Sequence, residues 1–225
     1  ARFAYLHQQD ITCCQLPEKQ LAKLKLLLSH RERLIRAKKM FDTASGEADM
    51  FLSKNLTKEI IKDSRSLIKT LEKKIKHTDT QISELVQSDE KLQQACELAS
   101  SVPGVGLQTA HHLIVVSRCF TSFQNARQLA CYAGVAPFEY SSGSSIRGKS
   151  RVSHLANKKL KSLLSMGALS AVKHDAELKR YYQRKLGEGK NAMAVLNAVK
   201  NKMLSRVFAA VHRGTPYVSI MNYSS

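Results

Sequence analysis

The segment from Leu56 to Asp89 most constrains the fold, because it contains neither proline nor glycine. A helix can run unbroken through such a segment. Its apolar and small polar residues recur at alternating spacings of three and four, in the order Ile61, Ser64, Ile68, Leu71, Ile75, Thr78, Ile82 and Leu85. This is the period of a helix that packs against a second helix along one seam. The segment therefore predicts one long helix of a coiled coil.

The second helix is expected upstream, over residues 17–41. Pro17 suits a first helical turn. The apolar residues near heptad positions are Leu21, Leu24, Leu28 and Ile35. Residues 42–55 contain Gly46 and several small polar residues, which predict a turn. We therefore expect a long antiparallel coiled-coil hairpin over residues 17–90. Two uses stay open: a plain helical spacer, or an arm that joins subunits into a homo-oligomer, a dimer or a tetramer.

The charge of the chain is concentrated after this arm. Residues 1–90 contain 17 Lys/Arg and 13 Asp/Glu, whereas residues 91–225 contain 19 and 5. Such an excess favours a polyanionic partner, with nucleic acid first and an anionic membrane surface second. No apolar run approaches the ~20 residues that span a bilayer. The five cysteines form no Cys-x-x-Cys pair, which favours a reducing cytoplasm.

A compact helical domain is predicted over residues 91–225, and residues 1–16 are expected to be a linker or the remnant of a preceding domain. Within it, Ser101-Val-Pro-Gly-Val-Gly106 lies between two helical segments, which is the pattern of a helix-hairpin-helix motif. Glycines permit close backbone approach, and the free amides that open a helix can receive a phosphate. The predicted nucleic-acid contacts here are Gly104, Gly106, Gln108 and Thr109. His111 and His112 lack partners at metal spacing and are expected to be core or surface residues.

A serine-rich, basic segment follows at residues 136–151, with a short hairpin expected around 137–152. It combines hydroxyl groups (Ser141, Ser142, Ser144 and Ser145) with cations suited to phosphate (Arg147, Lys149 and Arg151). His154 is a candidate base by its nearness in sequence. After residue 90 the acidic residues are too few to predict a metal site. Residue chemistry alone favours a flexible phosphate-contacting loop over nucleophilic catalysis.

Motifs in a fixed order add a family resemblance over about residues 98–213. They are Val-Pro-Gly-Val-Gly-x-x-Thr-Ala at 102–110, Phe-x-x-Ala-Arg-Gln-Leu-Ala-x-Tyr-Ala-Gly-Val-Ala-Pro at 123–137, Ser-Gly at 142–143 and Arg-Gly-Lys at 147–149. This set resembles the C-terminal domain of the insertion-sequence "one-ten" transposases, which include pilin-gene invertases and RNA-guided recombinases. The resemblance implies that Ser142 is the nucleophile and that strands are transferred through a phosphoserine link. Asn157, Lys158 and Lys159 fit as DNA contacts, although the family tends toward a basic residue and a glycine just before them.

The resemblance also implies a separate RuvC-like domain, with a carboxylate set that holds Mg²⁺. This sequence contains no such set, so we expect the chain itself to bind no metal or other cofactor. The expected partners are DNA, a guide RNA by resemblance only, and further copies of the chain, in a bacterial or archaeal cytoplasm. The alternative is a non-enzymatic helix-hairpin-helix module that binds nucleic acid.

Overall fold

The computed structural model describes residues 18–51, 54–136, 138–142, 146–151 and 155–219. It is mainly α-helical, as predicted, with one two-stranded antiparallel sheet in this part of the chain. The elements are α2 (Lys19–Phe51), α3 (Lys54–Gln87), α4 (Glu90–Ser100), α5 (Leu107–Ser117), α6 (Ala126–Tyr132), β1 (Phe138–Ser142), β2 (Ile146–Arg151), α7 (Lys158–His174), α8 (Ala176–Gly187) and α9 (Ala192–Arg213). No helix within the described ranges is long and apolar enough to cross a membrane.

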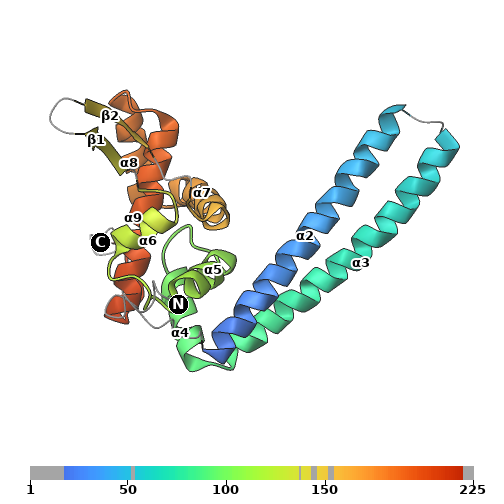
Figure 1. Cartoon of the computed structure of the whole chain (residues 1–225), viewed down its shortest axis with the longest axis horizontal. Helices are drawn as coiled ribbons and strands as arrows, with labels where there is room; N and C mark the ends of the chain where they lie inside the picture. The colour runs from blue at the N-terminus through green and yellow to red at the C-terminus, as the bar shows by residue number, and fades with distance from the viewer. Residues whose placement is uncertain (1–17, 52–53, 137, 143–145, 152–154, 220–225) are drawn as a thin grey trace, which may run out of the picture.

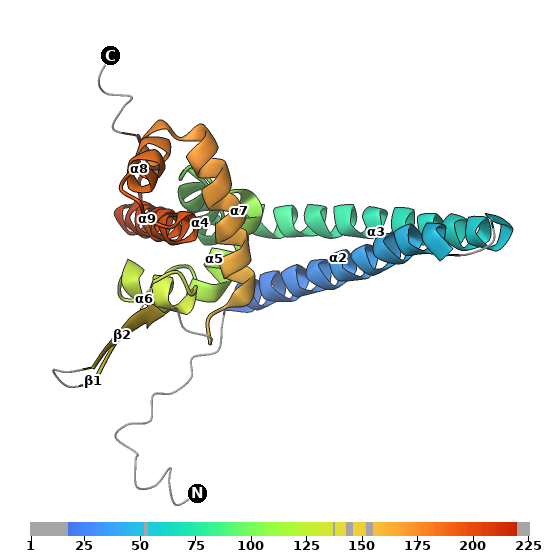
Figure 2. The ribbon, with the colours of Figure 1, turned by 90° about the horizontal axis from the view of Figure 1, so that it is seen from above.

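Helices α2 and α3 form a long antiparallel arm that projects from a compact helical body (Figures 1 and 2). Its seam is most deeply buried near the body, at Leu21, Leu24, Leu28, Ile82 and Val86. The two polar seam positions predicted from the sequence, Ser64 and Thr78, are also buried. Thr78 meets this burial by donating its hydroxyl to the Lys74 carbonyl at 2.9 Å.

The turn between the arm helices is shorter than predicted. The sequence places it at residues 42–55, but α2 continues through Gly46 to Phe51 and α3 begins at Lys54. A lone glycine costs a helix about 1 kcal/mol relative to alanine. No proline follows it before α3, so the helix has no strong stop signal.

Helix α9 is the centre of the compact body. It packs against α4, α6, α7 and α8. The apolar side chains of α9 with negligible exposure include Val199, Met203, Leu204 and Val207. Their spacings of four, one and three place them on one broad face of the helix.

The turn between α4 and α5 packs on α7 through two glycines. Gly104 has a φ of 86°, a conformation that L side chains rarely adopt. A Cβ built on Gly104 would overlap the Gly167 carbonyl oxygen and lie 2.8 Å from Ala171 Cβ and 2.9 Å from Met203 Cε. A Cβ on Gly167 would in turn overlap the Gly104 carbonyl oxygen. The two backbones can therefore meet only if both residues are glycine.

We expect Gly104→Ala to destabilise the body by about 2–4 kcal/mol, because it combines a strained φ with overpacking. Gly106→Ala is the matched control, since a Cβ there meets nothing within 4 Å and the φ is −80°. The control should cost no more than about 1 kcal/mol, because alanine is a poorer N-cap than glycine but meets no steric conflict. Urea unfolding of both variants measures the difference. Equal stability of the two variants would contradict the close packing of Gly104 on α7.

Candidate nucleic-acid interface

The start of α5 carries four of the predicted nucleic-acid contacts, and the structure separates them. Gly106 is the exposed N-cap of α5, and no side chain caps this helix end. The first backbone amides of α5 are therefore not capped by a side chain, as at helix N-termini that receive a phosphate. Gly104 is instead packed on α7, and Thr109 is buried. Of the four residues, Gly106 is exposed and Gln108 is half-buried.

Gln108 also links the body to the arm. Its side-chain amide donates to Asp79 Oδ1 on α3 at 3.3 Å. The same carboxylate accepts two hydrogen bonds from the Arg31 guanidinium on α2, with Nε at 2.5 Å and Nη2 at 3.4 Å. Such a two-pronged pair fixes orientation as well as distance. Arg31, Asp79 and Gln108 therefore hold the base of the arm against α5.

The start of α7 gathers the three contacts predicted after the serine-rich segment. The side chain of Asn157 caps the helix by accepting a hydrogen bond from the Leu160 backbone amide at 3.0 Å. The backbone amide of Asn157 donates to the Tyr132 carbonyl at 2.9 Å. Lys159 Nζ lies 3.6 Å from Glu32 Oε1 of the arm. Lys158 is exposed and makes no ion pair with the described residues. Lys158 is thus the one side chain of the three that is not already engaged.

The serine-rich segment forms a β-hairpin between α6 and α7. Its backbone register pairs Ser141 with Arg147 and Ser142 with Ile146, and the register shifts between Phe138 and Tyr140. Ser142 is the last residue of β1. The side chains of Ser142, Arg147, Lys149 and Arg151 lie outside the described part of the chain. Ser144, Ser145 and His154 lie outside it altogether, so these roles stay predictions.

Two acidic residues of the body, Asp175 and Glu177, are paired with one arginine. By sequence spacing alone, Asp175 and Glu177 are expected to face different ways on a helix. That expectation is wrong, because Asp175 is the extended N-cap of α8 and only Glu177 is helical. Both carboxylates meet Arg206, whose Nη1 lies 3.6 Å from Asp175 Oδ2 and whose Nη2 lies 2.6 Å from Glu177 Oε1. Among the described residues, no group of three His, Cys, Asp or Glu could hold a metal ion.

Sequence reasoning missed Lys200, a lysine that is 2% exposed within α9. Its ammonium donates to Asn197 Oδ1 at 2.9 Å. Burial lowers the pKa of Lys200, and the nearby positive charge of Lys161 on α7 lowers it further. The signal was present, since Lys200 precedes the buried Leu204 and Val207 at spacings of four and seven. A lysine on this face adds a buried cation to the joint between α7 and α9.

Residues 96–183 match the Transposase IS116/IS110/IS902 family. This range contains the α4–α5 turn, the hairpin and α7. The segment is a domain of that family. The family predicted from the ordered motifs is confirmed. Helices α2 and α3 lie outside the matched range, as does α9.

Relatives of this transposase domain are named for mobile or inverting DNA. The chain is 32% identical over 145 residues to the "Pilin gene-inverting protein" of Moraxella lacunata, which is 64% of this chain and 45% of that protein. It is 37% identical over 122 residues to the "Insertion element IS110 uncharacterized 43.6 kDa protein" of Streptomyces coelicolor, and the alignment covers 54% of this chain and 30% of that protein. It is 29% identical over 132 residues to the "Transposase for insertion sequence element IS1111A" of Coxiella burnetii, and the alignment covers 56% of this chain and 35% of that protein. The aligned region is thus less than half of each relative.

We expect His112 to make the transposase domain acid-sensitive. Burial, with the positive charges of Lys159, His111 and Arg31, lowers the pKa of His112 to about 4, against a smaller opposite effect of Glu32. The unfolded chain therefore binds this proton first, so stability is complete above pH 6.5 and is lost as the pH falls toward 4. One proton contributes at most about 1.4 kcal/mol per pH unit. Denaturant unfolding between pH 7 and 4 should show a shallower loss for His112→Gln. An unchanged slope would contradict the burial of a neutral His112.

Lys200→Met should stabilise the domain at pH 7 by about 1 kcal/mol, because it removes a desolvated cation and keeps the side-chain volume. The lowered pKa of Lys200 means that its cost is full below that pKa and disappears as the pH rises toward 10.5. The advantage of the variant should therefore be smaller at pH 10 than at pH 7 in urea unfolding. Destabilisation by Lys200→Met at both pH values would contradict this account.

Proposed function

We propose that this chain is the arm and transposase domain of a site-specific DNA recombinase, with Ser142 as its nucleophile. The observation that carries the proposal is the family match over residues 96–183, which includes the whole serine-rich segment. A relative that aligns over 145 residues is named for inverting a pilin gene. Ser142 belongs to the Ser-Gly pair among the ordered motifs of the family resemblance.

The proposed reaction conserves the energy of the cleaved phosphodiester bond in a bond between the DNA phosphate and Ser142. Ser142 Oγ attacks the phosphorus of a phosphodiester, so an Oγ–P bond forms and one P–O bond to deoxyribose breaks. The serine proton leaves to a base, and the departing deoxyribose oxygen takes up a proton. In rejoining, a free hydroxyl of another strand attacks the phosphoserine and releases Ser142. Arg147, Lys149 and Arg151 are the proposed cations that stabilise the charge of the five-coordinate phosphorus.

The DNA backbone is the proposed partner of the body. The helix N-terminus at Gly106 and the exposed Lys158 supply contacts in this part of the structure. The excess of cations after residue 90 gives the attraction, with 19 Lys/Arg against 5 Asp/Glu. A guide RNA and an oligomer joined through the arm remain further proposals from the resemblance. The chain is proposed to work in the cytoplasm, where such DNA lies.

Magnesium is not assigned to this chain. The resemblance implies Mg²⁺ on a RuvC-like domain, but the described residues of this chain do not offer the clustered carboxylates that the ion prefers. Asp175 and Glu177 are paired with Arg206, and Asp79 with Arg31. No step of the proposed reaction is therefore routed through a metal held here.

Covalent capture tests the nucleophile. The full-length gene product is incubated with a nicked DNA substrate whose cleaved strand diffuses away, so that the serine stays attached to DNA. We expect an adduct from the natural protein and from Ser141→Ala, and a loss of at least about a hundredfold from Ser142→Ala, because only one residue supplies the attacking oxygen. Peptide mapping of the adduct identifies the modified serine.

An adduct that persists in Ser142→Ala would exclude Ser142 as the nucleophile. Absence of any adduct with retained DNA binding would favour the non-enzymatic helix-hairpin-helix module. We further expect the 225-residue chain alone to bind DNA in a salt-sensitive way without completing recombination. Efficient recombination by this chain alone would contradict the need for a second catalytic domain.

A further inference from the structure

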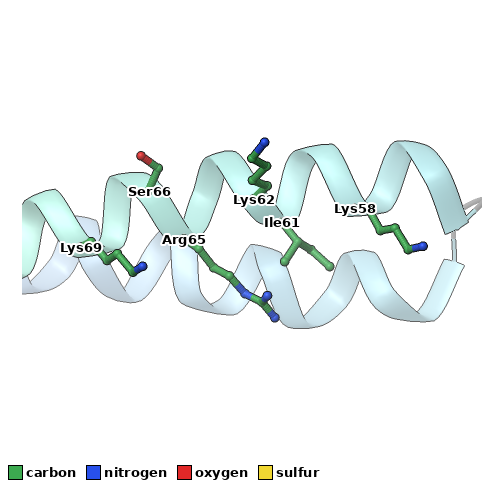
Figure 3. A pocket seen from close by; sticks show the side chains of 6 residues that line it. All are labelled: Lys58, Ile61, Lys62, Arg65, Ser66 and Lys69. Carbon is green, nitrogen blue, oxygen red and sulfur yellow. The ribbon is translucent and has the colours of Figure 1, made fainter.

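A stripe of cations runs along the outer surface of the arm. Its members are Lys58, Lys62, Arg65, Lys69, Lys73 and Lys76, all exposed on α3. Their spacings of four, three, four, four and three place them in a band about 80° wide on the helix, and the band is about 27 Å long. Figure 3 shows the first four on successive turns of α3, where with Ile61 and Ser66 they line an open hollow.

The stripe lies on the side of α3 that faces away from the packed seam. Ser64, Thr78 and Ile82 on the opposite side are buried against α2. Two of the acidic residues of α3 are neutralised by the partner helix: Glu72 binds Lys38 at 2.7 Å and Asp79 binds Arg31. The six cations make no salt bridge with any residue that the structure describes. Positive charge is thereby concentrated on one face, although α3 carries eight Lys/Arg and five Asp/Glu overall.

The chemistry of the stripe suits a regular line of phosphates. Helix α3 contains no Phe, Tyr or Trp, so it offers no platform on which unpaired bases could stack. A straight band of about 27 Å spans roughly eight base-pair steps of a duplex. Ser66 adds a hydroxyl that can donate to a phosphate oxygen. A pairing surface for another subunit would instead need apolar area, which this band of charges lacks.

We infer that the outer face of α3 is a second DNA-binding surface, which holds the backbone of duplex DNA along the arm. The inference rests on the proposed function, because it assumes that the chain acts on DNA. It gives the arm a role beyond that of a spacer or a subunit contact. This surface lies outside the domain that matches the transposase family.

The test compares two variants of the 225-residue chain that lose the same charge. The stripe variant replaces the six cations with glutamine, which keeps helix propensity. The control variant replaces six other exposed cations of the arm with glutamine: Lys19, Lys23, Lys25, Arg33, Lys39 and Lys74. Affinity for a 30-base-pair DNA duplex is measured by fluorescence anisotropy across a series of salt concentrations, and circular dichroism verifies that both variants are equally helical.

We expect the stripe variant to bind the duplex at least about tenfold more weakly, with a salt slope reduced by about 3, since each lost phosphate contact reduces it by about 0.9. The control should stay near the natural chain. Equal losses of DNA affinity in both variants would overturn the inference. A loss of affinity seen only with duplex RNA or single-stranded RNA, and not with the DNA duplex, would overturn it as well. If the natural chain itself does not bind DNA at low salt, the proposed function fails. If it binds and the stripe variant binds equally well, only the inference about the arm fails.

Discussion

The contact between Gly104 and Gly167 is the constraint on which the rest of the body depends. It brings the α4–α5 turn directly onto α7, with Met203 of α9 beside it. Helix α5 begins at the end of this turn, and α7 follows the hairpin that carries Ser142. The start of α5 and the start of α7 are therefore positioned by one close backbone approach. A side chain at either glycine would separate the two elements that carry the proposed DNA contacts.

The arm joins the body through one continuous apolar cluster, which includes Leu24 and Ile82 of the arm and Leu113 of the body, and polar contacts add to it. Arg31 and Asp79 connect the two arm helices, and Gln108 extends this pair to α5. Lys159 at the start of α7 lies near Glu32 of the same arm helix. Bidentate contacts of this kind add geometric specificity to the apolar packing. The apolar cluster and these polar contacts together fix the direction of α3, and so of the cations on it.

The sequence predicted the elements better than their partners. The heptad period of residues 61–85 identified the arm. Gly104 was recognised as a site of close backbone approach, but a phosphate was expected where the structure places Gly167. Asp175 and Glu177 were expected to face different ways because spacing within α8 does not show their common partner, Arg206, which lies on another helix, α9. Local patterns determine local conformation, while such pairings depend on the whole fold.

The central claim is that this chain binds the DNA backbone through two surfaces, one on the body and one on the arm. Lysine modification with mass spectrometry, with and without duplex DNA, tests both at once. The account predicts that DNA protects Lys158 together with Lys58, Lys62, Lys69, Lys73 and Lys76, while Lys25 and Lys74 stay reactive. Uniform protection of all these lysines, or protection of neither surface, would contradict it.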